Sequence, residues 1–367
     1  MLKMSKEDIL KVINVNDLDI RETGNGRWID QKCTPDVVCA VADIVDTITN
    51  DDRSIELTAK DVWYSDYARE NILEQFNKSD PTAKSAQAEY NKFYQQPLNL
   101  LSYANILKLT KKGRTNTYRV INAKLLEFIA MSDKNALFFL QVYIKEVLVN
   151  SGIYLLFNNF FKQQTSESFS QLKDGFSSFC HTYTNIKGKL EPNRIFAKVL
   201  NPLAQNLHKK GTSRGRMSKE IITYSSLMYN QENFRDIFAQ KPKGVSRQDW
   251  IKEHPIKKSV LAKFRSDSMK AKKFVRKFND KYFNGRSELH DDLASGEATQ
   301  MHHIFPQHSY TEISGYAENI IALTPSQHFT EAHPNNNTQK IDLNEQEILL
   351  KAKAHTIDYV IHHKEME

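Results

Sequence analysis

The segment 299–334 constrains the fold more than any other part of the chain, because its strand and helix signals follow one another closely. It holds five of the 12 histidines. Residues 299–305 have the pattern of a strand, and residues 320–323 form a second short apolar run. Thr324 then opens a helix with a capping box, which Gln327 completes, and with proline at the first helical position. We therefore expect a strand, a loop, a second strand and a helix, in that order.

Two adjacent histidines, His302 and His303, lie on the first of these strands. Because successive side chains of a strand point to opposite faces, the two rings cannot share one role. One can face the helix and bind a metal ion together with His328, while the other faces a substrate. A neutral imidazole suits both tasks, as a metal ligand or as a base that titrates near neutral pH.

This pattern resembles the HNH endonucleases, which are also called ββα-metal or His-Me finger nucleases. The resemblance rests on the run HHIFP, on Asn319 sixteen residues after His303, and on His328 nine residues after Asn319. It covers residues 299–334 only. It implies metal-dependent hydrolysis of phosphodiester bonds that leaves 5′-phosphate and 3′-hydroxyl ends.

The resemblance also implies a role for each matching residue. His303 is expected to be the general base that activates water, and Asn319 is expected to hold the loop that aims it. His302 and His328 are expected to bind one divalent metal ion, which stabilises charge on the phosphate and on the departing 3′ oxygen. Mg²⁺ is the expected ion, with Mn²⁺, Ni²⁺ and Zn²⁺ as alternatives.

His333 is a third candidate ligand of this metal. It lies five residues after His328, about 140° further round the helix, and can reach the ion only if the helix ends there, which Pro334 permits. Many members of the family also bind a structural zinc through cysteine pairs. This chain has three cysteines and no CxxC pair, so no thiolate zinc site or disulfide scaffold is expected.

Basic residues are concentrated directly ahead of the histidine segment. The whole chain has a formal charge of +7, whereas residues 257–286 hold 11 Lys and Arg against two Asp, a net +9. Phe and Tyr residues are interleaved among them, which is also the pattern of an amphipathic helix. This concentration favours a surface that follows DNA phosphates. The candidate DNA contacts in it are Lys272, Lys273, Arg276 and Lys277.

Residues 1–250 are predicted to be a mostly helical region that recognises DNA, with a sub-boundary near residue 122. A hairpin expected over residues 104–121 lies between two helical segments and is compatible with a winged helix. Its candidate DNA contacts are Lys111, Lys112 and Arg114. A flexible basic loop at 209–219 offers Arg214 and Arg216, and either site can equally be a solvated turn. We expect helices at about 35–49, 85–103, 123–131, 134–149 (capped by Asp133), 153–163, 167–182 and 217–229.

The predicted fold class is therefore α+β and mostly helical. Residues 240–256, with two prolines and a glycine, are the best candidate for a linker. Residues 251–367 would form a nuclease domain with the basic segment 257–286 as its lead-in. The order of a long N-terminal region and a C-terminal HNH finger looks like some type II restriction endonucleases.

The expected function is thus site-specific cleavage of double-stranded DNA. A homodimer is plausible because both strands must be cut, and the host would carry a cognate DNA methyltransferase. The alternatives are a DNA-binding regulator with a structural or degenerate metal site, a homing endonuclease and a non-specific nuclease. A second nuclease motif, suggested by Pro35-Asp36 with Glu56 and Lys60, is rejected because its spacing is too long.

The location expected for such a protein is the bacterial cytoplasm. The most apolar stretch, residues 136–149, is interrupted by Lys145 and Glu146 and is too short to span a bilayer. No apolar core follows the positive charge at the N-terminus, so we expect no signal peptide and no membrane partner.

Overall fold

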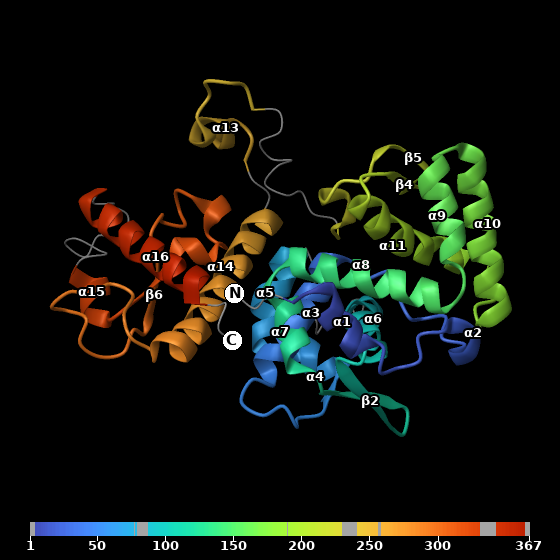
Figure 1. Ribbon diagram of the computed structural model, residues 1–367, viewed down its shortest axis with the longest axis horizontal. Helices are drawn as coiled ribbons and strands as arrows, with labels where there is room; N and C mark the ends of the chain where they lie inside the picture. The colour runs from blue at the N-terminus through green and yellow to red at the C-terminus, as the bar shows by residue number, and fades with distance from the viewer. Residues whose placement is uncertain are drawn as a thin grey trace. The chain divides into compact units, whose positions relative to one another are not determined.

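The computed structural model describes residues 4–76, 78, 87–188, 190–229, 241–255, 258–330 and 343–363. The chain divides into two compact units, residues 2–233 and residues 234–367. Helices dominate both units, and the strands form small antiparallel sheets (Figure 1). The fold is therefore α+β and mostly helical, as the sequence predicts.

The N-terminal unit is built around α3 (Pro35–Ile48), which begins at the predicted Thr34-Pro35 signal. Twelve of its residues, Asp46 included, are buried, and Asp46 accepts a 2.6 Å hydrogen bond from Arg53. α3 is therefore buried around most of its circumference. Arg53 satisfies the buried carboxylate of Asp46. The surrounding helices are α1 (Lys6–Ile13), α2 (Ile20–Thr23), α4 (Ala59–Tyr64), α5 (Asp66–Gln75), α6 (Gln87–Tyr103), α7 (Ala123–Met131), α8 (Asp133–Asn150), α9 (Tyr154–Gln163), α10 (Ser166–Tyr183) and α11 (Leu190–Asn206).

A three-stranded antiparallel sheet lies beside these helices. It consists of β1 (Leu57–Thr58), β2 (Leu107–Lys112) and β3 (Thr115–Val120) in the order β1–β3–β2. The pairing of β2 with β3 confirms the predicted hairpin. Tyr118 of β3 is buried, and its hydroxyl donates a 2.7 Å hydrogen bond to Asn99 of α6. That contact fixes which face of the hairpin lies against α6.

A second hairpin replaces the predicted basic loop and the helix predicted after it. β4 (Lys210–Ser213) pairs with β5 (Arg216–Ile221), and the 3-10 helix η2 (Ser225–Leu227) follows. Arg214 and Gly215 form the turn with φ values of 50° and 77°. A two-residue turn with positive φ at both positions matches the twist of paired strands, so it favours a hairpin over helix. The predictions for residues 209–219 and 217–229 are therefore wrong.

Two further differences concern helix ends and prolines. Ser132, rather than the predicted Asp133, caps α8 by accepting a hydrogen bond from the amide of Asn135. The sequence predicted no element over α11, which contains Pro202 within its length. Its buried apolar face stabilises the helix against the break that proline favours.

The C-terminal unit contains α14 (Lys258–Phe283), which confirms that the basic segment is an amphipathic helix. Its Ala271 and Val275 pack against Ile320 and Ala322. α14 lies against an antiparallel pair of strands, which are buried between it and the neighbouring helices. The other elements of this unit are α13 (Arg247–Glu253), β6 (Gln300–His303), η3 (Thr311–Ile313), η4 (Ala317–Asn319), β7 (Ile320–Leu323), α15 (Pro325–Thr330) and α16 (Leu343–His363).

Within the described residues, no single helix is both long enough and apolar enough to cross a membrane. α8 and α9 satisfy that test only when they are taken together, and the chain bends by 116° between them.

Candidate active site

β6 and β7 place the two adjacent histidines in the interior of the C-terminal unit. His302 pairs with Ile321 and His303 with Ile320 across the antiparallel ladder. Both side chains are buried, with 9% and 8% of their surface exposed. His303 contacts α14 and His302 contacts α15, so the two rings serve opposite faces of the strand, as the alternation predicts.

The surroundings of His303 define which of its nitrogens carries a proton. Its Nε2 lies 3.0 Å from the hydroxyl of Ser268 on α14 and 3.0 Å from the carbonyl oxygen of Ser314. A carbonyl oxygen only accepts, so this contact is a hydrogen bond when Nε2 bears the hydrogen. The lone pair then lies on Nδ1, which is the nitrogen available to accept a proton.

The charge state of His303 follows from the same surroundings. Burial lowers the pKa of His303, the positive charge of Lys272 lowers it further, and the hydrogen bond to Ser314 acts in the opposite direction. Lys272 lies one helical turn after Ser268 on α14, and burial lowers its own pKa as well. The imidazole of His303 is therefore uncharged at neutral pH.

Asn319 holds the loop that joins β6 to β7. Its side chain is buried; Oδ1 accepts a 2.8 Å bond from the amide of Phe305, and Nδ2 donates to the carbonyl of Phe305 at 3.1 Å. Nδ2 also donates to the carbonyl of Ile313 at 3.3 Å. Because Ile313 directly precedes Ser314, the amide of Asn319 fixes the carbonyl that orients His303.

His302 and His328 face each other, and we call them the facing histidines. Their ring centroids are 5.2 Å apart, and the ring planes meet at 75°. Two imidazoles that share one tetrahedral ion, at metal–nitrogen distances of about 2.1 Å, would have centroids about 5 Å apart. The spacing therefore fits a shared divalent ion.

The start of α15 fixes the position of His328. Thr324 accepts a 3.2 Å bond from the amide of Gln327, and its own amide donates to Oε1 of Gln327 at 3.1 Å, which confirms the predicted capping box. Gln327 is fully buried and also contacts Ser287 at 2.6 Å and the carbonyl of Leu289 at 2.8 Å. These bonds anchor the turn that carries His328.

The third predicted metal ligand, His333, lies outside the described residues. Within the described ranges, no group of three or more His, Cys, Asp and Glu side chains could hold a metal ion. Any metal bound by the facing histidines would therefore take its remaining ligands from water or substrate, unless undescribed residues contribute.

The predicted DNA contacts on α14 are partly exposed beside the strands. Arg276 is already engaged, because it donates to Asp280 at 3.1 Å and to the carbonyl of Ala298 at 3.3 Å. Lys272 is the member of this set whose positive charge lowers the pKa of His303. The full predicted set is Lys272, Lys273, Arg276 and Lys277, all of intermediate exposure.

The other predicted DNA contacts lie at the ends of the two hairpins of the N-terminal unit. Lys111, Lys112 and Arg114 are exposed around the turn between β2 and β3, and Lys112 pairs with Glu56 at 2.6 Å. Arg214 and Arg216 are exposed around the turn between β4 and β5.

The sequence did not identify Ser268 and Ser314, which both lie within hydrogen-bond distance of His303 Nε2. Ser314 acts through its backbone, which leaves no signature in the sequence. Ser268 and Lys272 are four residues apart in a segment that also has the pattern of a helix, so the sequence could have indicated that they lie on one face of it.

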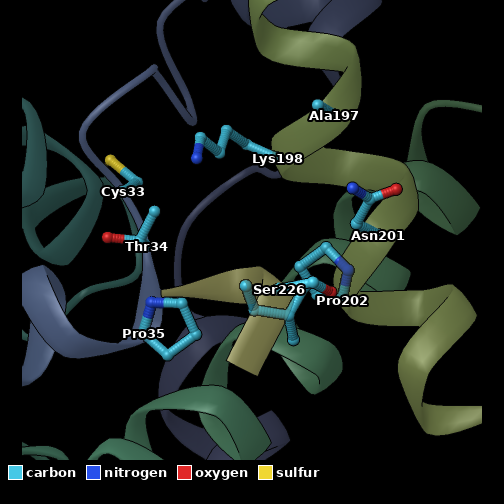
Figure 2. A pocket seen from close by; sticks show the side chains of 9 residues that line it. Cys33, Thr34, Pro35, Ala197, Lys198, Asn201, Pro202 and Ser226 are labelled. Atoms are coloured by element: carbon cyan, nitrogen blue, oxygen red, sulfur yellow. The ribbon is translucent and has the colours of Figure 1, made fainter. Parts of the chain in front are cut away.

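A separate cavity lies in the N-terminal unit, between α11 and the segment before α3. Figure 2 shows Lys198 extending from α11 toward Cys33 and Thr34. Burial lowers the pKa of Lys198 and raises the pKa of the Cys33 thiol to about 12. The thiol is therefore protonated and unreactive at neutral pH. None of the predicted site residues lines this cavity.

No known protein family, no curated protein and no solved structure matches the chain.

Proposed function

We propose that the chain is a divalent-metal-dependent DNA endonuclease of the HNH, or ββα-metal finger, type, and that His303 is its general base. The observation that carries the proposal is the placement of His303: the ring is buried and its Nε2 lies 3.0 Å from the Ser314 carbonyl oxygen, which leaves Nδ1 as the nitrogen that can accept a proton. Asn319 anchors the loop that orients this ring. His302 points to the opposite face of the same strand, where its ring faces that of His328 on α15.

In the proposed reaction, Nδ1 of His303 takes a proton from water as the water oxygen attacks phosphorus. The hydrogen bond from Nε2 to the Ser314 carbonyl stabilises the imidazolium that forms. The ammonium of Lys272 would bind a non-bridging phosphate oxygen. A divalent ion held by the facing histidines would supply positive charge to the phosphate and to the departing 3′ oxygen. The products carry 5′-phosphate and 3′-hydroxyl ends.

The donor set bears on which ion is used. Imidazole nitrogens suit Ni²⁺ and Zn²⁺, whereas Mg²⁺ and Mn²⁺ prefer carboxylate, carbonyl and water oxygens. Mg²⁺ stays a prediction from the sequence resemblance. The facing histidines themselves favour a transition-metal ion.

The number of protein ligands favours an enzyme over a regulator with a structural metal. Structural zinc is usually held by four protein side chains, whereas catalytic sites leave positions open. Within the described part of the chain, no third His, Cys, Asp or Glu side chain joins the facing histidines to form a metal-binding group. A general base at the adjacent position, His303, also has no role in a purely structural metal site.

The N-terminal unit supports a sequence-specific enzyme. The strand order β1–β3–β2, with α3 before β1 and α6 before β2, supports the winged-helix expectation. A unit of this size is not needed for hydrolysis alone. A restriction-type endonuclease, with a homodimer and a host methyltransferase, is the form of the proposal that follows.

The test is to incubate the full chain with plasmid DNA and Mg²⁺, Mn²⁺, Ni²⁺ or Zn²⁺, and to sequence the ends. We expect discrete fragments with 5′-phosphate ends. His303→Ala should abolish cutting while DNA binding persists, and His355→Ala, which removes an exposed histidine of the same unit, should cut normally. Unchanged cutting by His303→Ala would contradict the assigned base. Binding without cutting in every metal would favour the regulator, and a smear of fragments a non-specific nuclease.

A further inference from the structure

One face of α6 carries side chains suited to reading bases. Gln87, Asn91 and Gln95 are spaced four residues apart and form one stripe along the helix. Gln87 and Asn91 are exposed, Gln95 is partly exposed, and Lys92 beside them is exposed as well. The candidate DNA contacts predicted from the sequence did not include this stripe.

The opposite face of α6 is fixed in the core of the N-terminal unit. Tyr90, Phe93 and Tyr94 are buried, and the rings of Tyr90 and Tyr94 lie 5.8 Å and 6.5 Å from that of Trp63. Phe93 packs edge-on against Phe76 at 5.1 Å. A helix held this firmly presents its polar stripe in one orientation, which recognition of base edges requires.

The charge around α6 fits a polyanion. Glu89 is the single acidic residue of α6, and it accepts hydrogen bonds from Lys32 and Lys78 at 2.5 Å and 2.8 Å. The adjoining segment 104–121 contains five Lys and Arg and no acid. The region thus carries net positive charge, although Glu56 pairs with Lys112 of the hairpin.

The hairpin that follows α6 extends the same face. Figure 1 shows β2 and its turn projecting from the N-terminal unit. Tyr118 faces α6, so Asn116, two residues earlier on β3, lies on the same side of the sheet. Lys111 pairs with Asn116 across the strands and shares that side. Near its turn, the hairpin therefore carries Asn116 and Lys111 on the side of the sheet that faces α6.

We infer that α6 enters the major groove of double-stranded DNA and reads adenine-containing base pairs, while the β2–β3 hairpin contacts the adjoining backbone. Asn and Gln pair bidentately with adenine N6 and N7, and the major groove of B-DNA admits a helix. From Gln87 to Gln95 the helix rises about 12 Å, which corresponds to three or four base pairs at about 3.4 Å each. Duplex RNA is excluded because side chains cannot read its narrow major groove.

The choice of duplex DNA as the partner rests on the proposed nuclease function. The role of α6 in reading bases is tested by binding alone. The full chain, without divalent metal, selects bound duplexes from a randomised pool, and fluorescence anisotropy then measures affinities. We expect an enriched site containing A·T pairs. Asn91→Ala should weaken binding to that site about 5- to 150-fold and relax the preference at one position. Lys92→Ala should weaken binding to all duplexes alike and lower the salt slope by about one.

Gln171→Ala, which removes an exposed amide of α10, is the matched control and should leave the selected site and its affinity unchanged. Thermal melts of each variant show that the fold persists. An enriched site that Asn91→Ala and Gln95→Ala both leave intact would overturn the inference, as would a wild-type pool with no enrichment. Failure of His303→Ala to stop cleavage would overturn the nuclease proposal instead and leave this result standing.

Discussion

The removal of the Asn319 side chain tests whether the loop between β6 and β7 determines the state of His303. Asn319→Ala breaks three hydrogen bonds, two to the backbone of Phe305 and one to the carbonyl of Ile313. At about 1 kcal/mol each, their loss lowers the free energy of unfolding by about 3 kcal/mol. For a unit of this size the melting temperature should fall by roughly 10 °C.

The effect on cleavage should exceed the effect on folding. The freed loop lets the Ser314 carbonyl move away from Nε2 of His303, so the ring no longer holds one tautomer in one orientation. A misplacement of about 1 Å at a catalytic group costs about 100-fold in rate. We expect a loss of this size in the plasmid cleavage rate, measured well below the melting temperature of the variant.

Asn279→Ala provides a matched control in the same unit. Asn279 is also buried, but among the described residues its side chain makes one hydrogen bond, from Nδ2 to the carbonyl of Arg286 at 2.8 Å, and its Oδ1 makes none. We expect a loss near 1 kcal/mol and an unchanged cleavage rate. If Asn319→Ala melts and cleaves as Asn279→Ala does, the reasoning that links the loop to the base is wrong.

Three further predictions concern charge, pH and metal. Lys353→Met leaves the buried Glu288 carboxylate without the ammonium group that now lies 3.0 Å away. Urea denaturation should show that the free energy of unfolding falls by about 3–5 kcal/mol, and adding Glu288→Gln should recover part of this loss. Because the pKa of His303 is lowered, kcat/KM should hold as pH falls to the ordinary histidine value of about 6.5 and decline only below it. Lys272→Gln removes the positive charge that lowers the pKa of His303, so the decline should move to higher pH. A decline at the same pH in this variant would exclude an effect of the Lys272 charge on His303. EDTA should abolish cleavage, and His302→Ala should weaken Mn²⁺ binding in calorimetric titration; equal binding by this variant would show that the metal lies elsewhere.

Much of the C-terminal unit could be predicted from short-range signals. The capping box at Thr324 and Gln327, the apolar strand 320–323 and the basic amphipathic helix all depend on residues within one or two turns of each other. The hairpin at Arg214 and Gly215 was missed because a two-residue turn with positive φ is a weak signal when arginine occupies its first position. Similarly, Pro202 concealed α11, whose stability comes from packing.

The sequence by itself determined that His302 and His303 face opposite ways and that His328 lies in the first turn of a helix, because strand alternation and helix capping are local. Only the tertiary structure decided what each ring meets. Ser268 comes from a helix 35 residues earlier, and Ser314 contributes a backbone carbonyl that any residue could supply. The proton on Nε2 and the lowered pKa of His303 depend on these distant groups and on burial, and neither is a property of the histidine or its neighbours in sequence.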